Sequence, residues 1–202
     1  MLELMPQWLG HALKGVRAGH EKLAIAKLGI GGRSLDLTST AFHAGGPLPV
    51  WCTADGEGVS PPLSWDAAAP GGFALIVEDP DAPTPEPLVH AIVWNLAGGD
   101  GALDGGAALP RGAIAATGGA DTGPNSYGRT GWLPPDPPTG HGPHDYVFQL
   151  FALTEPLPLE PQPGRGALLD ALVGRIAAAG VLIGTYERGE TVSAPTGPAL
   201  AT

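Results

Sequence analysis

The sequence predicts a mostly β fold, and three observations support that prediction. Glycine and proline are abundant, with 32 and 23 of the 202 residues, which favours short strands and structured loops over long helices. Short apolar runs at 73–78, 89–96 and 146–153 are each flanked by proline or glycine, as strands in a sandwich or barrel are. These runs precede a late helix and a last strand, so an alternating α/β fold with a parallel sheet is not expected.

The overall composition limits both the size of the fold and the class of function. A chain of 202 residues with 43% apolar residues can bury a core in one domain, with room for an appended arm. Charged residues make up only 15%, so the chain is not expected to be disordered. The net charge of −10 is opposite in sign to that of most nucleic-acid-binding proteins, and that class is therefore disfavoured.

The first element is a predicted amphipathic helix at residues 7–28. Its apolar side repeats at three- and four-residue steps, through Leu9, Leu13, Val16, His20 and Leu23, and glycines at 29, 31 and 32 end it. Three glycines inside the segment weaken an isolated helix, so we expect it to pack on another surface.

That surface is expected to be the protein itself or a second copy of it. Residues 1–33 contain five cations and two acids, whereas the rest of the chain contains five cations and eighteen acids. Opposite charges favour docking of the arm on an acidic body, either within one chain or in a homodimer. The alternative is a helix lying on an anionic membrane, which Trp8 would suit but which would repel the acidic body.

The remaining elements follow from the same patterns. Residues 97–124 are rich in glycine and alanine and are expected to be mainly loop. A helix is predicted at 167–179, with Leu168, Leu172 and Ile176 on one side, and a last strand at 181–187. The predicted organisation is therefore a helical arm at 1–33, a β domain at 34–192 and a flexible tail at 193–202.

The cysteine count and the lengths of the apolar runs indicate the cellular compartment in which the protein is expected. Cys52 is the only cysteine, which excludes an internal disulfide. The first residues lack the charged start and uninterrupted apolar core of a secretory signal, and no run of about 18 apolar residues occurs. A cytoplasmic location is expected.

Three elements could carry chemistry, and the first two lie close together in the sequence. The corner DPDAP follows a predicted strand, and its two prolines make a rigid turn that can present Asp79 and Asp81 at fixed positions. His90 comes eleven residues after Asp79, and period-two alternation places it on one face with Ile92 and Trp94. A lone strand histidine is more often structural, but a neighbouring carboxylate would orient the ring and favour its protonated form.

The third element is the glycine- and proline-rich run at 125–148. It is expected to be a long ordered loop that leads into a strand, and such loops are often functional. Its polar and aromatic residues include Arg129, Trp132, Asp136, His141 and His144.

Together these elements resemble the phosphatidylethanolamine-binding protein family, most closely its bacterial Raf kinase inhibitor-like branch. The resemblance begins with SPPLSW at Ser60, continues with FALIVEDPDAP, His90 and Asn95, and includes residues 128–132 and the Pro137–Pro138 pair before it ends near Leu153. It covers about half of the chain.

The resemblance implies a Greek-key antiparallel β-sandwich with a few peripheral helices and a non-enzymatic role. It also implies a pocket for a phosphate-containing ligand or a phospholipid head group, and a possible kinase or protease partner, with no cofactor. Carried over by position, the expected ligand-binding residues are Asp79, His90, Pro138 and His144, with Asp81 in support and Arg129 and Trp132 from the loop. His141 has no counterpart in the family pattern.

Several positions depart from that pattern. The family's His-Trp pair is His90-Ala91, its His-Arg-Tyr is His144-Asp145-Tyr146, and Asp136 lies inside the proline-rich loop. Added carboxylates repel phosphate unless they are paired or protonated, so Arg129 is the nearest candidate to restore positive charge.

The alternative to a binding module is an enzyme. A metal-dependent hydrolase could use Asp79, His90 and His144, since zinc accepts histidine and carboxylate ligands. His141-x-x-His144 has helical spacing, but glycine and proline between the two histidines disfavour a helix. The chain contains no G-x-S-x-G elbow, Walker loop or dinucleotide fingerprint. A pure protein-interaction module is the third possibility.

Overall fold

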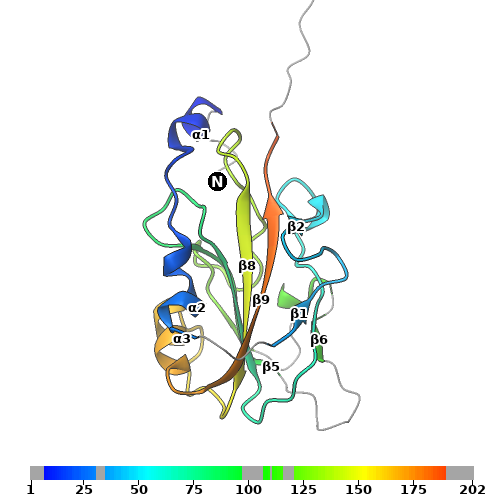
Figure 1. Ribbon diagram of the computed structural model, residues 1–202, viewed down its shortest axis with the longest axis vertical. Helices are drawn as coiled ribbons and strands as arrows, with labels where there is room; N and C mark the ends of the chain where they lie inside the picture. The colour runs from blue at the N-terminus through cyan, green and yellow to red at the C-terminus, as the bar shows by residue number, and fades with distance from the viewer. Residues whose placement is uncertain (1–6, 31–34, 97–106, 110, 116–120, 190–202) are drawn as a thin grey trace, which may run out of the picture.

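The computed structural model describes residues 7–30, 35–96, 107–109, 111–115 and 121–189. A six-stranded sheet lies in the middle, with a three-stranded sheet on one side and two short helices on the other (Figure 1). Strands predominate over helices between residues 35 and 160 in the described part of the chain, which confirms the predicted mostly β fold.

The large sheet has the strand order β2-β9-β8-β4-β5-β7. Its strands are β2 (Gly46–Pro47), β9 (Ile176–Tyr186), β8 (His144–Leu153), β4 (Phe73–Asp79), β5 (Leu88–Leu96) and β7 (Asp121–Gly123). Neighbours are antiparallel except β2 and β9, which pair in parallel, so the sheet is not antiparallel throughout as the resemblance implied. The Greek-key connection stays a prediction.

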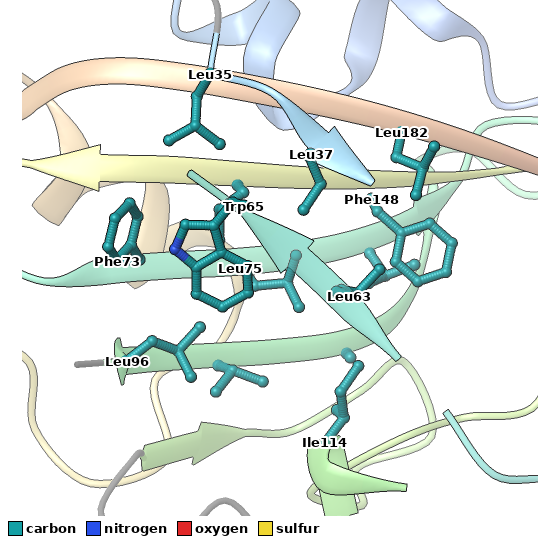
Figure 2. Packing of buried hydrophobic residues seen from close by; sticks show 14 of the residues in the cluster. Leu35, Leu37, Leu63, Trp65, Phe73, Leu75, Leu96, Ile114, Phe148 and Leu182 are labelled. Atoms are coloured by element: carbon teal, nitrogen blue, oxygen red, sulfur yellow. The ribbon is translucent and has the colours of Figure 1, made fainter. Parts of the chain in front are cut away.

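The small sheet contains β1 (Leu37–Thr38), β3 (Leu63–Trp65) and β6 (Ala107–Leu109) in the order β1-β3-β6. Alternation along β4 explains why the large sheet has two buried faces: Phe73, Leu75 and Val77 point to the small sheet, while Ala74 and Ile76 point to the helices. Figure 2 shows the first face, where side chains of both sheets interlock around Trp65 and Leu75.

The predicted continuous helix at 7–28 is wrong. The arm instead forms α1 (Gln7–Leu13), a 3-10 turn η2 (His20–Lys22) and α2 (Ala24–Lys27). Glycine weakens the helix between them, and Gly19 takes a φ of 108°, which a right-handed helix does not allow. The backbone N–H groups of Ala18 and Gly19 donate instead to the carbonyls of Ala82 and Pro80, at 2.9 and 2.8 Å.

The arm packs on its own chain, which is the first of the two arrangements expected from the sequence. Ala18, Leu23 and Ala24 are buried. Ile25 and Leu28 pack against the helix-side core, which is the apolar cluster between the helices and the face of the large sheet that carries Ala74 and Ile76. The sheet also caps α2, because the carboxylate of Glu78 accepts the N–H of Ala24 at 2.8 Å. A homodimer stays a prediction.

The predicted helix at 167–179 is right only in its first half. The helix α3 (Arg165–Leu172) buries Leu168 and Leu172, as expected, but Gly174 then turns the chain with a φ of 75° and Ile176 begins β9. The last strand therefore starts five residues before the predicted 181.

The other described elements are short. Two 3-10 turns, η3 (Val50–Cys52) and η4 (Ala113–Ala115), join strands, and β6 and β7 lie inside the stretch 97–124 that was expected to be loop. Residues 97–106, 110 and 116–120 of that stretch and the predicted tail at 193–202 lie outside the described residues.

Candidate functional site

A β-bulge determines the direction of His90. Val77 pairs with Ala91 but Glu78 pairs with Val89, so β5 has one extra residue at His90. The bulge moves His90 off the face that alternation had assigned to it with Ile92 and Trp94, and that prediction is wrong. The imidazole lies instead against Tyr146, with ring centroids 5.0 Å apart, and near Trp132 at 6.1 Å. Bulges commonly redirect a side chain beside a functional site.

A pocket of about 350 Å³ lies beside this bulge. Its lining includes four of the predicted residues, Asp79, His90, Arg129 and His144, which the chain brings together from β4, β5, β8 and the loop before β8. Pro134 and Pro137 also line it.

The other three predicted residues are not among the lining residues. Pro137 lines the pocket in place of Pro138. Trp132 stacks on Phe148 at 6.0 Å and donates its indole N–H to the Cys52 carbonyl at 3.1 Å, so it supports the pocket wall. Asp81 belongs to the same corner as Asp79, but its side chain is engaged elsewhere: one carboxylate oxygen accepts the backbone N–H of Asp145 at 2.7 Å.

His90 is almost completely buried, with 1% of its surface exposed. Its Nδ1 lies 2.6 Å from the carbonyl oxygen of Leu133 and must donate to it. Its Nε2 is buried and has no hydrogen-bond partner among the described residues. Burial lowers the pKa of His90 below its ordinary 6.5, although the Asp79 carboxylate opposes that shift. The resting imidazole is therefore neutral, with a bare Nε2.

Asp79 and His144 form the second feature of the pocket. Oδ2 of Asp79 lies 2.8 Å from Nδ1 of His144, and both side chains are buried. His144 Nε2 lies 2.7 Å from Nδ1 of His141, whose own Nε2 lies 2.8 Å from the carbonyl oxygen of Leu13. The pocket wall is thus connected through His141 to the N-terminal arm.

The extra carboxylates at the pocket are paired with arginines. Arg188 contacts Asp136 with Nη1, and its Nη2 lies 2.8 Å from Asp55. Arg111 lies 2.6 Å from Glu57. These ion pairs reduce the repulsion that the carboxylates of Asp136 and Glu57 would exert on an anion.

A family model described as phosphatidylethanolamine-binding protein matches residues 38–187. The chain belongs to the phosphatidylethanolamine-binding protein family. The resemblance seen in the sequence is thereby confirmed, and the matched range begins after the arm.

The chain is also similar to proteins named UPF0098 in other organisms. A UPF0098 protein of Mycobacterium tuberculosis is 41% identical over 157 residues, which cover 77% of this chain and 72% of that protein. A UPF0098 protein of Methanothermobacter thermautotrophicus is 36% identical over 162 residues and is covered completely, with 77% of this chain.

Solved structures agree with the family assignment. A phosphatidylethanolamine-binding protein homologue from Chlamydia trachomatis is 36% identical, with a TM-score of 0.67, 78% of this chain covered and 99% of that one. YbcL of Escherichia coli is described as a member of the mammalian phosphatidylethanolamine-binding protein family. It is 29% identical, with a TM-score of 0.65, and the match covers 77% of this chain and 99% of YbcL.

Family membership did not point to His141, Arg188 or the arm. His141 was visible in the loop but had no position in the family pattern, and Arg188 follows the last strand, 52 residues from Asp136. Leu13 and Arg17 lie outside the matched range. Only their contacts in the fold connect them with the pocket.

The hydrolase alternative gains no support from the geometry. Both ring nitrogens of His144 are engaged by His141 and Asp79. Among the described residues, a grouping compatible with a metal ion is His20, Asp81 and Asp145 instead. The guanidinium of Arg17 already contacts Asp81 there, so we assign no metal to it.

None of the helices in the described ranges is long and apolar enough to cross a membrane. The expected cytoplasmic location and the kinase or protease partner stay predictions.

Proposed function

We propose that this chain is a non-enzymatic binding protein of its family whose pocket accepts a small phosphate-like anion, either free or as a phospholipid head group. The observation that carries this proposal is the buried Nε2 of His90, which borders the pocket without a partner among the described residues. A buried polar atom without a partner is costly, so a ligand that hydrogen-bonds to it gains affinity.

The charges around the pocket support an anion over a neutral ligand. Arg129 lines the pocket, the carboxylate of Glu57 is paired with Arg111, and that of Asp136 is paired with Arg188, which it shares with Asp55. A phosphate oxygen can accept a hydrogen bond from Nε2 once His90 takes up a proton, which an anion beside it favours. Affinity should therefore rise as the pH falls through the titration range of the bound imidazole.

The names of the relatives point the same way at the level of the family. The matching family is described by its binding of phosphatidylethanolamine, whose head group contains a phosphate. A volume of about 350 Å³ is suited to a head group and is at the lower end for small-molecule sites.

The test separates the two nitrogens of His90. His90→Asn keeps an amide near the Nδ1 position, where it can donate to Leu133, but has no group at the Nε2 position. His90→Gln can place an amide nitrogen near Nε2. Calorimetry with inorganic phosphate and with phosphoethanolamine should show about tenfold or greater weakening for His90→Asn, because a hydrogen bond to a charged group contributes about 1.5–3 kcal/mol. His90→Gln should retain part of the affinity.

The matched control is His43→Asn, which removes an exposed imidazole that does not line the pocket. It should bind phosphate as the wild type does. Equal affinity of the wild type and His90→Asn for both probes would exclude His90 as a contact, and no binding of either probe by the wild type would reject the proposed ligand class.

A further inference from the structure

The N-terminal arm lies against both corners that carry the pocket residues. Gly10 packs so closely on the loop before β8 that a Cβ added there would overlap the carbonyl oxygen of Thr139. Beyond α1, the arm hydrogen-bonds to Pro80 and Ala82 in the corner that follows Asp79. Segment 10–19 therefore spans the loop before His144 and the corner after Asp79.

Charged groups of the arm strengthen this contact. The guanidinium of Arg17 pairs with Asp81 and donates to the carbonyl of Pro143 at 3.2 Å. His20 Nε2 lies 3.6 Å from a carboxylate oxygen of Asp145. Asp145 stands where the family pattern has an arginine, so the arm brings positive charge to the position that lost it.

The series of hydrogen bonds from Leu13 to Asp79 determines how many protons His141, His144 and Asp79 must bind together. It has three contacts in a row, from the Leu13 carbonyl to His141, from His141 to His144, and from His144 to Asp79. Each contact needs one proton between its two heavy atoms, so the series needs three. Two neutral imidazoles supply two, and one further proton must be bound. The net charge of the three side chains is then zero.

The carbonyl of Val16, also on the arm, is a second hydrogen-bond partner of His141, so displacement of the arm removes both acceptors. Their removal changes that count. His141 Nε2 would no longer have to donate, and the two remaining contacts need only two protons. His141 can then donate from Nδ1 to His144, and His144 can donate from Nδ1 to an ionised Asp79. The three side chains would together carry one negative charge on the pocket wall.

We propose that arm segment 10–19 is a positioning element of the pocket, in which the Leu13 carbonyl holds the ring of His141 in the tautomer that keeps the Asp79–His144 pair uncharged overall. The effect on ligand binding rests on the proposed function, because an uncharged wall repels a phosphate anion less than a negative one. The tautomer of His141 does not depend on any ligand.

The groups around the series determine where the additional proton resides. Burial and the neighbouring His144 lower the pKa of His141, which disfavours a doubly protonated His141 ring. The charged or titratable groups that face this series from the surrounding elements are Arg17 and His20 on the arm, Asp81 in the corner, His90 on β5, Asp145 and Tyr146 on β8, and Asp136 in the proline-rich loop.

The experiment uses a pair of glycines in the full-length chain. Gly10→Ala should displace α1, because the new methyl group overlaps the Thr139 carbonyl, whereas a Cβ at Gly15 meets nothing within 4 Å. Gly15→Ala is therefore the control. Alanine favours a helix more than glycine does, so a loss of contact in Gly10→Ala cannot come from helix propensity.

The first readout is the protonation of the histidine ring nitrogens, measured by nitrogen NMR without ligand. The wild type and Gly15→Ala should carry the His141 proton on Nε2 with a bare Nδ1, and Gly10→Ala should move it to Nδ1. A wild-type His141 with a bare Nε2 would overturn the proposal even if Gly10→Ala failed to fold, and so would an unchanged tautomer in a folded Gly10→Ala whose α1 resonances show displacement.

The second readout is phosphate affinity by calorimetry. Gly10→Ala should bind inorganic phosphate several-fold more weakly than Gly15→Ala at neutral pH. Equal affinities together with the expected tautomer change would reject the effect on ligand binding but not the role of the arm. No phosphate binding by the wild type, together with the expected tautomer change in Gly10→Ala, would reject the proposed function and leave the positioning role intact.

Discussion

Individual histidines give the pocket its distinctive chemistry, because their ring nitrogens differ in hydrogen-bond partners. His90 has one nitrogen bound to a carbonyl and one without a partner among the described residues, whereas both nitrogens of His144 and His141 are engaged. The first can respond to a ligand directly. The other two respond to the arm.

The burial of His90 makes stability depend on pH. An unfolded imidazole titrates near pH 6.5, and burial lowers the folded pKa of His90 below that value. The unfolded chain therefore binds more protons here as the pH falls, and stability that is present above pH 6.5 is lost below it. Relative to His90→Asn, the free energy of unfolding of the wild type should fall by up to about 1 kcal/mol between pH 6.5 and 5.5.

Urea unfolding at pH 7.5, 6.5 and 5.5 measures this difference. Wild-type and His90→Asn curves that shift in parallel with pH would contradict the expected neutral state of the buried ring. Saturating phosphate should reduce the acid loss in the wild type only, since an anion beside Nε2 favours the protonated form.

Among secondary-structure elements, β4 has a double role. Its end presents Asp79 to the pocket on one side, while Glu78 lies on the helix side, where it is fully buried. Glu78 accepts hydrogen bonds from the N–H of Ala24 and the side-chain amide of Gln149, both at 2.8 Å, and it pairs with Arg165 at the start of α3. One carboxylate thus joins α2, α3 and the sheet.

Glu78→Gln should therefore destabilise the fold strongly. Removal of the charge leaves the largely buried guanidinium of Arg165 with only the more distant carboxylate of Glu86, and breaking a buried ion pair costs up to about 3–5 kcal/mol. Glu155→Gln is the control, because Glu155 forms an exposed ion pair with Arg175 and should change stability by about 1 kcal/mol or less. Similar denaturation midpoints for the two variants would show that Glu78 does not hold the helices to the sheet.

At the scale of the whole molecule, the arm acts as part of the fold although it lies outside the matched family range. It covers the helix-side core with Leu23 and Ala24 and contacts the pocket corners through segment 10–19. In this protein, the arm therefore adds both buried apolar surface and contacts to the candidate site.

Deletion of residues 1–33 should lower the melting temperature. The deletion exposes core residues and leaves the carboxylate of Glu78 with fewer hydrogen bonds, at a cost of about 3 kcal/mol or more, which corresponds to roughly 6–12 °C for a domain of this size. Scanning calorimetry measures the shift, and light scattering of the same samples tests the predicted homodimer. Lys14→Ala, at an exposed position of the arm, should leave the melting temperature unchanged. An unchanged melting temperature after the deletion would mean that the arm adds no stability.

Much of this architecture could be read from local patterns. Short apolar runs bounded by glycine and proline predicted β4, β5 and β8 to within two residues, because a strand that is buried on both faces needs a nearly uninterrupted apolar run. The acidic corner, His90 and His144 were identified because their residue types and spacing match the family pattern. The helix boundaries were predicted less well, since the interior glycines of the arm and Gly174 break patterns that otherwise fit a helix.

The sequence by itself determined the family, the mostly β fold and the presence of Asp79, His90 and His144, because each depends on residues close together in the chain or on a recognisable pattern. Only the tertiary structure decided which way His90 points, since that depends on a register shift between two strands. It also decided that Arg188 pairs with Asp136 and that the Leu13 carbonyl contacts His141, 128 positions away in the chain. Such contacts form between residues that no local pattern connects, because the free energy that places them comes from burial of the whole core.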